Sequence, residues 1–168
     1  AKSRTIVSYS GKTIYNFRAG FLTFTLPSEQ RHPTSVILKE CWERLLTQFR
    51  NVLKMQNYDW KLEFQKNGNV HFHLLTDTYI DYHYSRRAWN IILERLGYVS
   101  AYAQTFSALS FAEYRNRVDP QGVQDVKALA SRYAQGKRSN WMNPNSVDVR
   151  NVTNDRAISY YLSKYIAK

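Results

Sequence analysis

The segment that decides the fold is residues 58–76, which read YDWKLEFQKNGNVHFHLLT. Two strand-like runs flank a turn at residues 66–69, so the segment is predicted to form a β-hairpin. Alternate side chains of a strand share a face, so His71 and His73 point to one side and Phe72 to the other. Two imidazoles side by side on a strand are well placed to bind a divalent metal.

The register of this hairpin decides whether a carboxylate joins the two histidines. A two-residue loop would mix apolar and polar side chains on one face. A three-residue loop, with Gly68 in the left-handed region, gathers the apolar side chains on the other face and is therefore expected. We expect it to pair Glu63 with His73 and Gln65 with His71.

The sequence thus predicts a metal site of Glu63, His71 and His73, with Gln65 beside it. Two imidazoles and one carboxylate with open positions suit Mg²⁺ or Mn²⁺ together with phosphate, and they also suit zinc. The alternative is a half-polar strand face exposed to solvent.

Composition points to one domain, residues 1–168, with a polyanionic partner. Lys and Arg total 24 against 13 Asp and Glu, which gives a net charge of +11. Nucleic acid is the commonest partner of so basic a domain, and 15% aromatic content suits single strands, whose bases stack on rings. We find no transmembrane run, no signal peptide and no cysteine besides Cys41. We therefore expect an intracellular protein without a membrane partner or a small-molecule substrate.

The rest of the chain alternates between strand and helix patterns. Apolar residues at three- and four-residue steps predict helices after Pro33, over 85–96, and from Asp119-Pro120 to Gly136. Strands are expected over 21–26, around 99–106 and over 146–152, and a loop over 137–146. The pattern indicates an α+β fold with an antiparallel sheet.

A final helix is expected from Asn154-Asp155 to Lys168. Ile158, Leu162 and Ile166 mark its buried stripe. The ordinary role of a tyrosine beside such a stripe is packing at the edge of the core.

Two tyrosines of this helix border the stripe one turn apart, Tyr161 and Tyr165, and Tyr160 projects away from it. A phenol, whose pKa is about 10, attacks phosphorus only when its oxyanion or the transition state is stabilised. A metal that polarises the phosphate and the ammonium of Lys164 are the candidate stabilisers. Attack on a backbone phosphorus releases a 3′-hydroxyl and leaves a 5′-phosphotyrosine. Tyr160 remains a rival nucleophile because the phase of the helix is uncertain by one residue.

Three ordered blocks resemble the rolling-circle replication initiators (Rep) of the His-hydrophobe-His (HUH) endonuclease family. They are residues 21–25, Glu63 through residues 71–73, and residues 161–164. The resemblance implies Glu63, His71 and His73 as ligands of Mn²⁺ or Mg²⁺, with Tyr161 as nucleophile. Lys164 matches the family's tyrosine-x-x-lysine motif. It also implies an RNA-recognition-motif-like fold, with a central antiparallel sheet of about five strands flanked by helices.

The implied activity is metal-dependent nicking and joining of single-stranded DNA at a replication origin, often presented by a hairpin. The spacing of Tyr161 and Tyr165 looks like the two-tyrosine arrangement of phage initiators, so a phage or plasmid source and the bacterial cytoplasm are favoured. The host nucleus is expected for a eukaryotic virus. The chain is also compatible with a nuclease domain excised from a longer Rep protein.

Two other functions remain open from sequence. One is a nucleic-acid-binding module without chemistry, and the other is a transposase of the same nuclease family. Lys137, Arg138 and Trp141 in the polar loop are candidate DNA contacts, although a solvated loop explains them equally well.

Overall fold

The computed structural model describes residues 2–166, without the side chains of residues 165 and 166. The strands are β1 (Arg4–Val7), β2 (Thr13–Phe17), β3 (Ala19–Thr25), β4 (Tyr58–Phe64), β5 (Val70–Thr76) and β6 (Val147–Val152). The helices are α1 (Thr34–Ile37), the π-helical turn η1 (Leu38–Trp42), α2 (Glu43–Val52), α3 (Tyr82–Glu94), α4 (Tyr98–Ser107), α5 (Phe111–Val118), α6 (Val126–Arg138) and α7 (Asp155–Ile166). The α+β class predicted from the sequence is confirmed.

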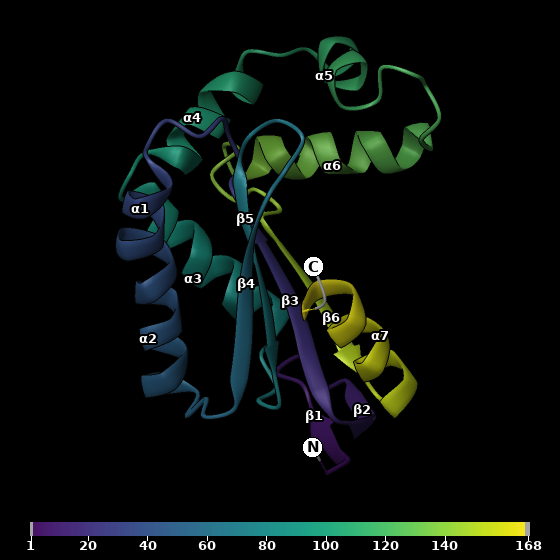
Figure 1. The fold of residues 1–168 in the computed structure, drawn as a ribbon. Helices are drawn as coiled ribbons and strands as arrows, with labels where there is room; N and C mark the ends of the chain where they lie inside the picture. Colours follow the sequence, from purple (N-terminus) through teal and green to yellow (C-terminus); the bar gives the residue numbers. More distant parts are fainter. Residues whose placement is uncertain (1, 167–168) are drawn as a thin grey trace.

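The described strands form a four-stranded antiparallel sheet in the order β4-β5-β3-β6, and a separate two-stranded hairpin of β1 and β2. The central sheet therefore has four strands in place of the five expected. Figure 1 shows α2 and α3 along one side of this sheet and α7 on the other.

The strand expected around residues 99–106 is wrong, because these residues belong to α4. Gly97, at φ 79°, ends α3, and α4 begins at the next residue. Tyr98, Tyr102 and Phe106 recur every four residues, a helical spacing that strand-forming residue types masked. The helix packs that stripe inward, since Tyr98 is fully buried and the other two rings border a buried cluster.

The β4–β5 hairpin has the expected kind of turn but a different pairing. Gly68 adopts φ 85°, and Gln65 pairs with Asn69 around three turn residues. Glu63 therefore lies opposite His71, and not opposite His73 as expected; the partner of His73 is Lys61. The two registers differ by two residues, an even number, so every side chain keeps its face.

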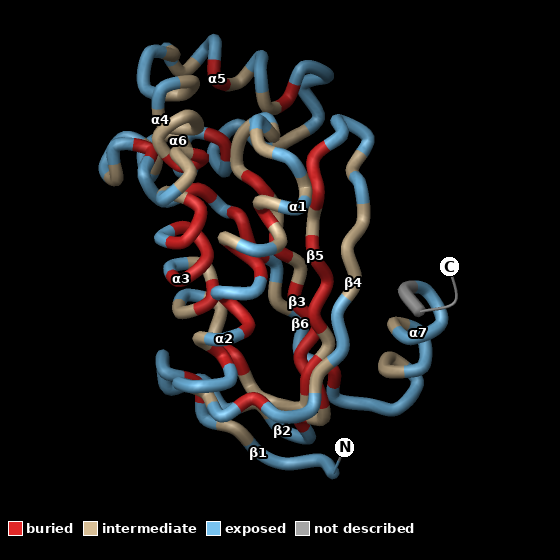
Figure 2. Tube along the Cα trace, turned by 60° about the vertical axis from the view of Figure 1, so that its left-hand side comes forward, coloured by how far each residue is buried: buried red, intermediate tan, exposed pale blue. Residues whose placement is uncertain are grey.

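The main core lies between the sheet and the helices α1–α3. Leu22, Phe24, Phe72 and Leu74 point to it from β3 and β5 and are fully buried. The indole of Trp42 stacks on the ring of Phe72, with centroids 4.5 Å apart. The helical spacing that predicted the helix after Pro33 is confirmed by its buried residues, Ile37, Cys41, Trp42, Leu45 and Phe49. Figure 2 shows this burial running along β5 and β3 and the helices beside them.

The single helix expected from Asp119-Pro120 to Gly136 is two helices, α5 and α6, with a turn between them. Asp119 lies in that turn, where its carboxylate accepts the backbone N–H groups of Val123 and Gln124. Asp125 caps α6 instead. No described helix is long and apolar enough to cross a bilayer.

Gly136 does not stop α6, which continues to Arg138. A Cβ atom at Gly136 would lie 2.3 Å from the ring of Trp141, so the glycine serves close packing. Helices α4–α6 and the loop 139–146, hereafter the helical cap, enclose a separate small core around Tyr114, Leu129 and Trp141.

Candidate metal centre

Three side chains from the β4–β5 hairpin converge on the sheet face opposite the main core. The Nε2 atoms of His71 and His73 lie 3.3 and 3.0 Å from Oε2 of Glu63. One ligand atom from each residue lies within 4.8 Å of the other two. This group can hold a divalent metal, and its residues are those that the sequence predicted.

Burial and hydrogen bonding set the charges of this group. Burial lowers the pKa of His73, although the hydrogen bond to Glu63 opposes the shift. Burial works to raise the pKa of Glu63, but its hydrogen bonds with His73 and His71 prevail and lower it. An ionised carboxylate beside a neutral imidazole is the protonation state that metal ligation requires.

A hydroxyl on the neighbouring strand holds the ring of His73. Thr23 is the β3 partner of His73, and its Oγ1 lies 3.0 Å from Nδ1 of His73. A hydroxyl can donate or accept, so Thr23 supports either tautomer, including the one whose Nε2 is open to a cation. The sequence analysis did not identify Thr23 as a supporting residue; its signal was a hydroxyl on the polar face of β3.

Two further residues belong to this face of β4. Lys61, which was not predicted, places its Nζ 3.9 Å from Oε1 of Glu63. Gln65 follows Glu63 by two residues, so strand alternation directs both side chains to one face. Gln65 lies at the turn, where its backbone pairs with Asn69, and a role beside the metal stays a prediction.

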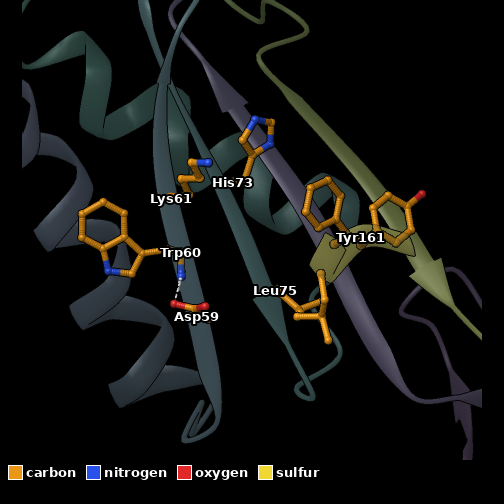
Figure 3. Close-up of a pocket in the computed structure, with 8 residues that line it drawn as sticks. Asp59, Trp60, Lys61, His73, Leu75 and Tyr161 are labelled. Atoms are coloured by element: carbon orange, nitrogen blue, oxygen red, sulfur yellow. Dashed lines mark hydrogen bonds between the residues drawn. The ribbon is translucent and has the colours of Figure 1, made fainter. Parts of the chain in front are cut away.

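Helix α7 lies over the same face and brings one tyrosine toward the metal group. Tyr161 stacks on Phe21 of β3, with centroids 4.5 Å apart, and Phe21 stacks on His73 at 5.5 Å. Tyr161 is thus on the expected face, but one aromatic ring separates it from His73. Figure 3 shows His73 on the sheet and Tyr161 on the helix at the rim of one small pocket, which Lys61 and Leu75 also line.

The buried stripe of α7 differs from the expected one. Ala157, Ile158 and Tyr161 pack on a cluster of Ala19, Phe21 and Val152, whereas Leu162 is exposed. The inner face of the helix is therefore rotated toward Tyr161. The side chains of Tyr165 and Ile166 lie outside the described residues.

The remaining residues of the tyrosine motif face outward. Tyr160 is 58% exposed. Lys164 is exposed, and its Nζ lies 5.8 Å from the centroid of the Tyr160 ring. Neither arrangement assigns a catalytic role to these residues.

An arginine that the sequence analysis missed stands beside Tyr161. Arg150 of β6 is the register partner of Phe21, the residue on which Tyr161 stacks. The ion pair with Asp148, 3.0 Å long, raises the pKa of Arg150, and Tyr161 raises it further through a hydrogen bond. A single Arg in a strand gives no signal in one sequence, so only the register reveals it.

The three candidate DNA contacts of the loop 137–146 have different environments. Lys137 and Arg138 are exposed at the end of α6. Trp141 was expected on an exposed loop, but only 4% of it is exposed. Its ring packs with Tyr114 and Phe106 in the helical cap, which is a packing role.

The model of one protein family, described as replication-associated protein ORF2, matches residues 19–168. The chain belongs to this family. The match includes the metal group, Arg150 and α7, and it leaves out the β1–β2 hairpin. Neither the curated proteins nor the solved structures contain a match.

Membership places this replication-associated protein in the class that the sequence indicated. A role in replication implies contact with nucleic acid, consistent with the net charge of +11. The fold and the Glu63–His71–His73 group are consistent with the expected nuclease family.

Proposed function

We propose that the protein is an HUH-type endonuclease that nicks and rejoins single-stranded DNA at a replication origin and so starts rolling-circle replication. The observation that carries the proposal is the shared sheet face. A carboxylate and two imidazoles with metal-ligand geometry lie on it, and the only tyrosine among the described side chains of α7 that packs inward lies over it.

Glu63, His71 and His73 would hold a Mn²⁺ or Mg²⁺ ion, whose Lewis acidity polarises a bound phosphate. The donor set fits, since one carboxylate and two imidazoles leave positions for phosphate oxygen and water. Thr23 and Lys61 act on the ligands, one by orienting His73 and the other by offsetting the charge of Glu63.

Tyr161 would supply the nucleophile. Its phenolic oxygen attacks phosphorus, the bond from phosphorus to the 3′-oxygen breaks, and that oxygen leaves as a hydroxyl after taking up a proton. The product is a 5′-phosphotyrosine, and attack by a 3′-hydroxyl reverses the step and rejoins the strand. The guanidinium of Arg150 favours the phenolate over the phenol, because it is a fixed positive charge beside the oxygen.

The stack of Tyr161, Phe21 and His73 sets a condition on this reaction. A phosphate that touches both the cation and the phenolic oxygen has to lie along the edge of Phe21, between the two outer rings. Phe21 therefore fixes the direction in which the DNA backbone crosses the sheet. Lys164 and Tyr165 follow within one helical turn, so a second strand transfer through Tyr165 would use the same face of α7.

The test is an SDS-resistant adduct. Incubation with Mn²⁺ and a single-stranded origin oligonucleotide should give a covalent protein–DNA band, and EDTA should abolish it. His73→Ala should abolish the band, whereas His83→Ala, which removes an exposed histidine of α3, should leave it intact.

Two outcomes would favour the other functions. Binding that ignores EDTA and never yields an adduct indicates a binding module. Cleavage of transposon-end sequences in preference to an origin indicates a transposase.

A further inference from the structure

A second cleft lies in the helical cap, apart from the metal group. The start of α3, the helix α6 and the loop 139–145 enclose about 620 Å³. This volume is within the range of about 300–1,000 Å³ that is usual for small-ligand sites. It suits one or two nucleotides and excludes a duplex.

The charged residues that line this cleft are all arginines. Arg86, Arg132 and Arg138 contribute to its walls, and no Asp or Glu does. Arg86 donates to the backbone carbonyls of Asn143 and Pro144, and Arg132 donates to the amide oxygen of Gln124. Among the described residues none of the three forms an ion pair with a carboxylate. A concave surface of one charge sign focuses its field and attracts an anion.

Aromatic rings form the rest of the walls. Tyr82 and Tyr102 are half-buried at the cleft, and the guanidinium of Arg86 lies 5.9 Å from the centroid of the Tyr82 ring. Exposed amides of Asn143 and Asn145 stand at the same rim. Rings beside cations are the combination with which proteins hold unpaired bases and their phosphates.

The loop that closes the cleft has an uncommon backbone. Asn140 and Trp141 adopt φ 50° and 59°, in the left-handed region that costs a non-glycine residue about 1–3 kcal/mol. The conformation folds the indole of Trp141 under α6, where the N–H of Trp141 donates to the carbonyl of Gly136 at 2.8 Å. The chain thus tolerates strain in order to hold the wall of the cleft in place.

We propose that this cleft binds a short single-stranded stretch of DNA, with Arg132 and Arg138 on its phosphates and a base against Tyr82 or Tyr102. The identity of the polymer rests on the proposed function. The cleft itself carries no chemistry, so it would set affinity for the substrate and leave the reaction at Tyr161 unchanged.

The test measures binding in EDTA, where no cleavage occurs, by the fluorescence anisotropy of a labelled oligonucleotide. The double variant R132Q/R138Q should bind at least tenfold more weakly than the parent. The matched control R87Q/R95Q removes two exposed arginines of α3 and its end, and the same total charge, and should lose much less affinity. The logarithmic salt slope of R132Q/R138Q should fall by about 1.4, the value for two lost phosphate contacts with single strands. R132K/R138K should restore most of the affinity.

Three results would overturn the proposal. The first is an equal loss in both double variants, which indicates general electrostatics. The second is a duplex that binds as tightly as the single strand and loses as much on substitution. The third is a fall in the rate of adduct formation at saturating DNA, which places the arginines in the reaction site. Because the binding assay needs no reaction, it is decisive even for a protein that forms no adduct.

Discussion

The two faces of the central sheet are built from the same strands and do different work. On one face Leu22, Phe24 and Phe72 are fully buried against helices. On the other face their immediate neighbours Thr23 and His73 belong to a polar group that only α7 approaches. Strand alternation thus separates stability from chemistry by one residue, so substitutions at adjacent positions should fail in different ways.

The largest effect is expected for the core face. Phe72→Ala removes a fully buried ring that stacks on Trp42, and it should lower the free energy of unfolding by about 3–5 kcal/mol. Urea denaturation measures the loss. A loss below about 1 kcal/mol would mean that this face is not the one that holds the fold together.

The neighbouring residue should show the opposite balance. His73→Ala removes one of three ligands, so the affinity for Mn²⁺ should fall by more than about 100-fold, beyond the range for outer-shell partners. The free energy of unfolding should fall less than in Phe72→Ala. Calorimetric titration with Mn²⁺ and urea denaturation give both numbers. Metal affinity that survives this substitution would contradict the site.

A smaller effect is expected one strand away. Thr23→Val keeps the shape of the side chain but removes the hydroxyl that contacts Nδ1 of His73. The affinity for Mn²⁺ should fall by about 10–100-fold. Thr13→Val, on the exposed strand β2, is the control and should change nothing. Equal affinities in the two variants would show that the hydroxyl does not orient the ligand.

The smallest effect is expected at the rim of the polar face. Arg150→Gln removes the positive charge beside Tyr161 and should slow adduct formation by about fivefold or less, because the arginine is exposed. Arg156→Gln, an exposed arginine of α7, is the matched control. A rate equal to that of the control would remove Arg150 from the account.

Much of this division between the faces was accessible from the sequence, because it depends on parity. The pairing expected for Glu63 was wrong by two residues, yet the three ligands still converge, since an even shift keeps each side chain on its face. The long helix was predicted for a similar reason, from a repeat that tolerates small errors in its bounds.

Features that depend on distant contacts were not accessible. Residues 98–107 are rich in strand-forming types, and only their packing in the helical cap selects a helix. Trp141 looked like an exposed loop residue because nothing local indicates that Gly136 makes room for its ring. The insertion of Phe21 between His73 and Tyr161, and the place of Arg150, follow from the β3–β6 pairing alone.

The central claim is that the inward tyrosine of α7 reacts on the face that carries the metal group. Tandem mass spectrometry of the DNA adduct formed with Mn²⁺ tests it most directly. The account predicts a nucleotide on Tyr161, and loss of that modified peptide in Tyr161→Phe; any residual adduct should map to Tyr165 and vanish in the double variant. A wild-type adduct on Tyr160, or on a residue outside α7, would contradict the account.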